Sequence, residues 1–110
     1  MSTPIKVIEV NDALIVGEVE IYTVDWTPEG TPSAAVAVGY IKGESTDLTS
    51  VLFAGGVGTC TMSGAIATLP AITVRAGDGA KTYRIVISAT IGSRTRKIAV
   101  EIPISAPWGE

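Results

Sequence analysis

Apolar and polar residues alternate most regularly between residues 79 and 104, where the sequence reads GAKTYRIVISATIGSRTRKIAVEIPI. The alternation breaks once, at Gly92-Ser93, which predicts a β-hairpin that turns there. One face of this hairpin collects apolar side chains from both strands: Tyr83, Ile85, Ile87, Ala89, Ile98, Val100, Ile102 and Ile104. A shift of either strand by one residue would expose the isoleucines, so the register is strongly specified. Pro103 has no N–H to donate, and we therefore expect the last strand to end at a sheet edge.

Shorter strand-like runs come before the hairpin and are separated by turn signals. They predict strands at residues 5–10, 13–26, 34–41, 48–53, 59–62 and 65–75. Pro70 places part of the last of these runs at an edge or a bulge. Two prolines and a glycine within residues 27–32 predict a loop.

The run at residues 13–26 has the alternation of a half-buried strand. Its two faces carry Val19, Ile21 and Thr23 on one side and Glu18, Glu20 and Tyr22 on the other. Trp26 ends the run directly before the loop. We expect it to be a core tryptophan whose N–H binds a loop carbonyl, with an exposed binding residue as the alternative.

These runs amount to seven to eight short strands with turn signals every eight to twelve residues, and no segment keeps a helical period. The pattern predicts an all-β fold, an immunoglobulin-like antiparallel β-sandwich. An up-and-down barrel is the alternative. The chain of 110 residues has the size of one domain, so we expect a single sandwich over residues 1–110, with extended terminal segments at 1–4 and 105–110.

Charge and composition restrict the classes of partner. The net charge is −3, and we expect no nucleic-acid partner, because such proteins carry a basic footprint. Eight of the 11 acids precede residue 50, whereas six of the eight basic residues lie between Arg75 and Lys97. This distribution indicates either two solvated faces or a bipolar surface that orients the molecule between unlike partners. The single cysteine, Cys60, forms no internal disulfide and is expected to be a small buried hydrophobe.

No apolar run approaches the length that spans a bilayer, and the first residues have no signal-peptide pattern. We therefore expect no membrane partner and synthesis in a cytoplasm.

The sequence offers little chemistry. It has no histidine and one cysteine, which excludes the Ser-His-Asp and Cys-His nucleophilic sites and the usual structural zinc sites. The GGVG run at residues 55–58 lacks the lysine and hydroxyl of a phosphate-binding loop. Glu18 and Glu20 would lie about 7 Å apart on a strand, as either a solvated face or a carboxylate pair for glycoside hydrolysis. Asp78 is either a turn residue or a calcium ligand. We expect no enzyme activity, no cofactor and no metal.

The candidate partner contacts are the loop at residues 27–32, the basic residues after the hairpin turn and the C-terminal tail. Arg94, Arg96 and Lys97 cluster directly after the hairpin turn, where they either keep a sheet edge soluble or dock an acidic neighbour. Trp108, in the tail at residues 105–110, either folds back on the domain or anchors a partner, because tryptophan is a frequent interface hot spot.

The run from Gly79 to Ile104 resembles the C-terminal signature of the small phage fibre–tail adaptor proteins. Their Gly-x-x-x-Tyr motif falls on Gly79 to Tyr83, and a strand, a short polar turn and a final strand of alternating aliphatics follow it. The segment 22–26 (YTVDW) is similar to their early strand that ends in Asp-Trp. The resemblance covers most of residues 13–104. It departs from the tyrosine-corner spacing, because Asp78 precedes Tyr83 by five residues, one more than that motif has.

The resemblance implies a non-catalytic virion structural protein with an immunoglobulin-like fold, assembled in a host cytoplasm. It implies an adaptor at the tail or head–tail joint that bridges tail, neck or fibre proteins, in several copies around a symmetric assembly. Two alternatives stay open, a capsid decoration protein and a carbohydrate- or receptor-binding module. The second needs exposed aromatic side chains, and only three tyrosines, two tryptophans and one phenylalanine are present.

Overall fold

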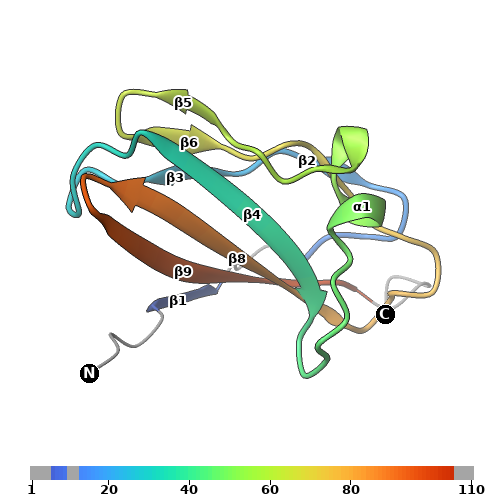
Figure 1. Ribbon diagram of the computed structural model, residues 1–110. Helices are drawn as coiled ribbons and strands as arrows, with labels where there is room; N and C mark the ends of the chain where they lie inside the picture. Colours follow the sequence, from blue (N-terminus) through green and yellow to red (C-terminus); the bar gives the residue numbers. More distant parts are fainter. Residues whose placement is uncertain (1–5, 10–12, 106–110) are drawn as a thin grey trace.

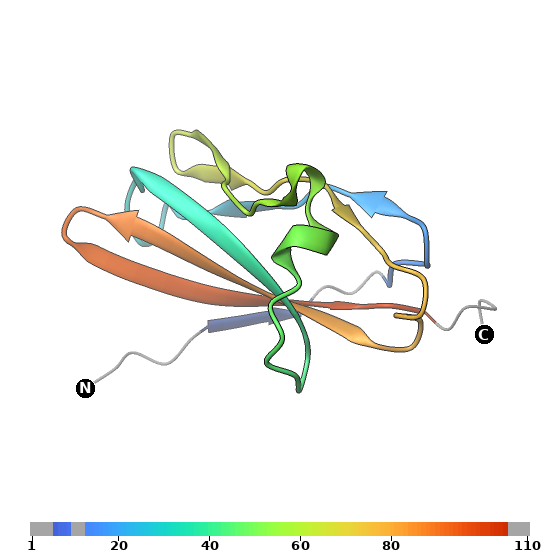
Figure 2. The same cartoon turned by 45° about the vertical axis from the view of Figure 1, so that its right-hand side comes forward.

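The computed structural model describes residues 6–9 and 13–105, and for residues 6–9 the backbone alone. Two β-sheets face each other as an all-β, immunoglobulin-like sandwich, which confirms the predicted fold class (Figure 1). The first sheet has the order β1 (Lys6–Glu9), β9 (Arg94–Pro103), β8 (Thr82–Ile91) and β4 (Ala34–Ile41). The second has the order β3 (Thr23–Asp25), β6 (Ile66–Thr68) and β5 (Thr61–Ser63). Figure 2 shows the two sheets as separate layers.

A third, two-stranded sheet pairs β2 (Val19–Glu20) with β7 (Ile72–Thr73) and continues the β3–β6 pair. The register shows an extra residue between the two pairs. Two residues separate Glu20 from Thr23, whereas three separate their partners Thr68 and Ile72. This bulge contains Pro70, as predicted, because proline cannot donate to a regular ladder.

The β8–β9 hairpin turns at Gly92-Ser93, as predicted, and its register runs from the pair Thr82–Pro103 to the pair Ile91–Arg94. Its predicted apolar face is buried between the sheets. Each fully buried isoleucine or valine stabilises the fold by roughly 1.5–3 kcal/mol, which selects this register over a one-residue shift.

The expectation that the last strand ends at a sheet edge was wrong. Strand β9 lies between β8 and β1, and β1 pairs with it in parallel. Beyond β1, the Leu14 N–H donates to the carbonyl of Pro103 at 3.0 Å. Proline keeps its carbonyl acceptor, so Pro103 fits an interior position here.

The structure decides which of the two faces of residues 13–26 is buried. Val19 and Ile21 are 60% and 56% exposed, whereas Val24 and Trp26 are buried and Tyr22 packs against the core. Burying the side with two aromatic rings removes more apolar surface from water than burying Val19, Ile21 and Thr23 would. A strand has only two faces, so burial of the face with Tyr22 and Trp26 leaves Val19 and Ile21 exposed.

Residues 48–53, predicted as a strand, are mostly helical. They form α1 (Thr49–Leu52), and the 3-10 helix η1 (Ala54–Gly56) follows. Asp47 accepts a hydrogen bond from the Thr49 N–H at 2.8 Å and so starts the turn. Leu52 lies over Gly39, where a Cβ would come within 2.9 Å of its Cδ1 atom. The helical turn thus fills the space that the glycine leaves on β4.

The segment after η1 closes one side of the sandwich against β4. Ala37 donates to the carbonyl of Gly58 at 2.8 Å, and Cys60 donates to the carbonyl of Ala35 at 2.9 Å. Cys60 is buried, as predicted, and burial raises the pKa of its thiol. Trp26 is 2% exposed, which confirms a core tryptophan, but its indole N–H has no hydrogen-bond partner among the described residues. The predicted bond to a loop carbonyl is therefore wrong.

Candidate docking surface at the hairpin end

Two segments that are far apart in the sequence meet at one end of the sandwich, the loop between β3 and β4 and the turn between β8 and β9 (Figure 1). The Ser33 N–H donates to the carbonyl of Thr90 at 2.9 Å. A Cβ on Gly30 would lie 2.8 Å from the Cγ2 atom of Ile91, so the loop backbone packs closely on the hairpin. We call this loop and this turn together the hairpin end.

Local hydrogen bonds shape the β3–β4 loop. Asp25 Oδ1 accepts from the Thr27 N–H at 2.9 Å and from the Thr27 hydroxyl at 2.5 Å. The side-chain bond and then the backbone bond from Thr27 lower the pKa of Asp25. The Trp26 carbonyl accepts from the N–H groups of Glu29 and Gly30 at 2.7 and 3.0 Å. The loop is therefore a folded turn, which is typical of a preorganised contact surface.

An ion pair joins this loop to the hairpin. Arg96 donates from Nε and Nη2 to Glu29 Oε1 at 2.9 and 2.6 Å. About a third of each side chain is exposed, so the pair adds little to the free energy of unfolding, up to about 1 kcal/mol. Its larger effect is positional, because it fixes the loop against β9.

The three predicted basic residues take different roles. Arg96 is used within the molecule, whereas Arg94 and Lys97 are exposed and make no ion pair with any described residue. Lys97 lies opposite Ser88 on β8. The hairpin end thus presents two cations beside an internal ion pair.

Trp108, the fourth predicted contact, lies outside the described residues. The first residue of its predicted tail, Ser105, still pairs with the domain. Its N–H donates to the Leu14 carbonyl at 2.7 Å, and its carbonyl accepts from the Ala80 N–H at 3.2 Å. Ser105 therefore belongs to the folded domain, and residues 106–110 of the predicted tail lie outside the described residues.

Glu29 belongs to the loop at residues 27–32, which was a predicted contact, but its pairing with Arg96 was not predicted. Only the fold brings it to Arg96, which is 67 positions away in the sequence. A local signal was present in Asp25 and Thr27, because an aspartate two residues before a threonine favours a side-chain turn.

Asp78 is held by its neighbours, as expected of a turn residue. It accepts from Tyr83 Oη at 2.5 Å and from Arg75 Nε at 2.8 Å, and Lys81 Nζ lies 4.0 Å away. The Arg75 N–H in turn donates to the Tyr83 hydroxyl at 3.0 Å. A tyrosine corner therefore forms despite the five-residue spacing.

The pKa values in this network shift in opposite directions. Burial alone would raise the pKa of Asp78, but hydrogen bonds from Arg75 and Tyr83 and the charges of Arg75 and Lys81 lower it below its usual value. Burial, and then the bond to Asp78, raises the pKa of Tyr83 to about 12. At neutral pH the carboxylate is thus ionised and the phenol protonated, which suits the hydrogen bond between them.

Glu18 and Glu20, the candidate carboxylate pair for glycoside hydrolysis, each accept a hydrogen bond from a nearby backbone N–H. Glu18 Oε1 accepts from the Ile15 N–H at 2.6 Å, and Glu20 Oε1 accepts from the Ile21 N–H at 3.1 Å. Both side chains are exposed, so neither lies in a cleft. In the part of the chain that the structure describes, no three histidine, cysteine, aspartate or glutamate side chains gather as a metal site.

Comparisons with protein-family models, curated proteins and solved structures found no significant match to this chain. None of the described helices is long and apolar enough to cross a membrane.

Proposed function

We propose that the protein is a non-catalytic phage virion structural protein. In this role it is an adaptor at the tail or head–tail joint, and it positions fibres or neighbouring virion proteins. The virion assignment comes from the sequence resemblance of residues 79–104 and 22–26 to the fibre–tail adaptor proteins. The docking role is supported by the geometry of the hairpin end.

The observation that carries the docking role is the ion pair between Arg96 and Glu29. It joins the β3–β4 loop and the hairpin into one surface before any partner arrives. A preordered surface loses less conformational entropy on binding than two separate loops would. Arg94 and Lys97, exposed beside it, suit an acidic partner surface and would speed association with it.

A capsid decoration protein would use the same surface and differs only in its position on the particle. A carbohydrate-binding module is less well supported. Trp26, Phe53 and Tyr83 are buried, and Tyr22 and Tyr40 are half-buried, so no described aromatic side chain forms an open platform for a sugar.

Binding to purified tail, neck and fibre proteins tests the docking surface. We expect the double variant Arg94→Gln, Lys97→Gln to lose roughly tenfold in affinity for its partner, mainly through slower association. The matched control is Ser45→Glu, Thr46→Glu, in the exposed loop after β4. It changes the net charge by the same amount and should bind like the wild type. Equal loss in both variants would show a general charge effect in place of a docking surface.

Immunogold labelling of particles from the source lysate tests the position. Label at the tail or neck supports the adaptor, and label over the whole capsid supports the decoration protein. If the chain is missing from mature particles by mass spectrometry and binds no tail or neck protein, the structural role is wrong.

A further inference from the structure

The free edge of β3 is a second candidate surface, on the side of the sandwich away from β4. Among the described strands, β3 pairs only with β6. The Tyr22 carbonyl accepts from the Leu69 N–H at 2.9 Å, so the backbone of Tyr22 faces β6. Backbone groups alternate in direction along an antiparallel strand, so Thr23 and Asp25 direct their N–H and C=O groups toward the free edge.

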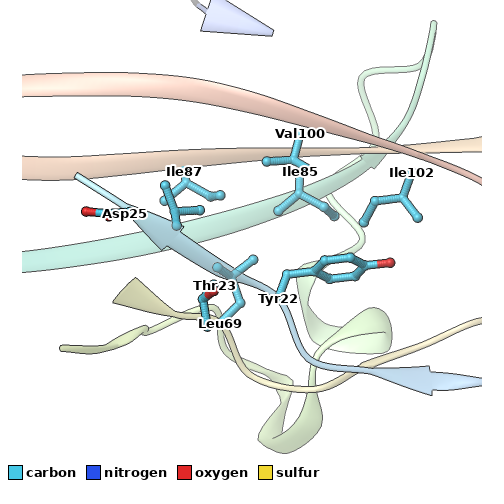
Figure 3. A pocket seen from close by; sticks show the side chains of 9 residues that line it. Tyr22, Thr23, Asp25, Leu69, Ile85, Ile87, Val100 and Ile102 are labelled. Atoms are coloured by element: carbon cyan, nitrogen blue, oxygen red, sulfur yellow. The ribbon is translucent and has the colours of Figure 1, made fainter. Parts of the chain in front are cut away.

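An apolar cavity of about 200 Å³ adjoins this edge, because Thr23 and Asp25 belong to its lining. Aliphatic and aromatic side chains from both sheets form its walls: Tyr22, Val24, Ile85, Ile87, Val100 and Ile102. Figure 3 shows the isoleucines of β8 and β9 pointing toward the strand that carries Tyr22 and Thr23. Apolar cavities of about 150 Å³ stay dry and accept small apolar molecules. This cavity is therefore large enough for aliphatic side chains from an added strand.

The surface along the same edge is apolar and acidic. Val19 and Ile21 are exposed, and so are Glu20, which lies between them in the sequence, and Asp25 at the end of β3. Neither carboxylate makes an ion pair with a described residue. An incoming segment with positive charge would complement this edge, whereas an acidic segment would be repelled.

We propose that the β3 edge receives an extended segment of a neighbouring protein, with alternating aliphatic residues flanked by lysine or arginine. This segment adds a strand to the β3–β6–β5 sheet through backbone hydrogen bonds to Thr23 and Asp25. Its inward side chains fill the cavity, and its cations lie beside Glu20 and Asp25. The inference names one partner of the adaptor and rests on the proposed function. The molecule then holds two unlike partners, an acidic one at the hairpin end and a basic one at β3.

Titration of the isotope-labelled full chain with a synthetic peptide, KVTVTVK, followed by NMR, tests the edge. We expect shifts in the amides of Thr23 and Asp25 and in the methyl groups of Ile87 and Val100. The acidic peptide EVTVTVE has the same apolar pattern and should bind roughly tenfold more weakly.

Two matched variants test the charge contribution. Asp25 and Asp47 are both exposed, and each accepts a hydrogen bond from the N–H of a threonine two residues later. Asp25→Lys should weaken binding of KVTVTVK roughly threefold or more, whereas Asp47→Lys should leave it unchanged. Equal weakening by both variants, or equal binding of the two peptides, would overturn the proposal.

Two further results would also overturn it. Absence of any shift at millimolar peptide shows that the edge takes no added strand. Shifts of the Thr23 and Asp25 amides when the chain alone is concentrated show that a second copy occupies the edge in place of a different partner. The variant Arg94→Gln, Lys97→Gln should bind KVTVTVK like the wild type, which separates failure of the edge from failure of the hairpin end.

Discussion

At the scale of single residues, the Tyr83 hydroxyl links a carboxylate and a backbone amide. Tyr83 and Asp78 are both almost completely buried, at 0% and 2% exposure. A buried carboxylate is stable only when hydrogen-bond donors or cations replace its hydration. Tyr83, Arg75 and Lys81 supply these groups, and the network ties the turn before β8 to the strand itself.

Tyr83→Phe should lower the free energy of unfolding by about 1–3 kcal/mol, because Asp78 then lacks one donor while the ring stays buried. Urea denaturation measures this change. Tyr40→Phe is the matched control, since Tyr40 is half-buried in β4 and its loss of a hydroxyl should change stability by less than about 0.5 kcal/mol. Equal effects of the two substitutions would contradict a special role for Tyr83.

The network also predicts how stability depends on pH. The pKa of Tyr83 rises from 10.0 to about 12, so folding favours the protonated phenol. Its contribution to stability is complete below pH 10 and is lost as the pH rises from 10 through about 12. The lowered pKa of Asp78 has the opposite sign, so its contribution is present above pH 3.8 and is lost as the pH falls below that value.

Thermal unfolding of wild type and variants across pH measures both contributions. Above pH 10, Tyr83→Phe should lose less stability than the wild type, because it has no phenol to ionise at this position. Lysines titrate in both proteins, so the difference between the two stability losses reports on Tyr83 alone. As the pH falls below 3.8, Asp78→Asn should lose less stability than the wild type. If the stability of the variants depends on pH in the same way as that of the wild type, Tyr83 and Asp78 do not control the pH dependence.

At the scale of elements, the close approach of residues 58–60 to β4 depends on a glycine. A Cβ on Gly58 would lie 1.7 Å from the carbonyl oxygen of Ala37, which no side chain can occupy without moving the backbone. Gly55 lies in the same GGVG run but has open space around it and a φ of +77°. The two glycines are therefore needed for different reasons, one for space and one for backbone conformation.

Gly58→Ala should lower the free energy of unfolding by more than about 2 kcal/mol, since it separates this segment from β4. Gly55→Ala should cost about 1–2 kcal/mol, the penalty of a left-handed conformation for a residue with a side chain. Chemical denaturation of the two variants measures the difference. An equal cost would show that the segment moves away from β4 without loss.

At the scale of the whole molecule, one cluster of buried side chains draws on both sheets. Trp26 enters it from the end of β3, and Ile85 and Ile102 enter it from the facing sheet. Neither sheet buries its apolar face without the other, so the two should fold as a unit.

The expected result is a single cooperative transition, with Trp26 fluorescence and far-ultraviolet circular dichroism changing at the same denaturant concentration. The variant Trp108→Phe should be used, so that Trp26 alone reports. Two separated transitions would show that one sheet persists without the other.

The fold class and the best-formed elements can be read from the amino-acid sequence, because their signals are local. The β8–β9 hairpin and β4 keep a period of two with strongly apolar positions, and a turn dipeptide marks the bend between β8 and β9. The cluster of Arg94, Arg96 and Lys97 was also visible as sequence.

Where the local sequence allowed two conformations or two buried faces, packing in three dimensions selected one of them. Residues 13–26 had two faces, and the facing sheet selected the one with Tyr22, Val24 and Trp26. The run at residues 48–53 is compatible with a strand, but the gap above Gly39 favours a helical turn that places Leu52 there. The pairing of Arg96 with Glu29 and the free edge of β3 depend on segments that are distant in the sequence. Such contacts follow from packing of the whole core, which no local pattern encodes.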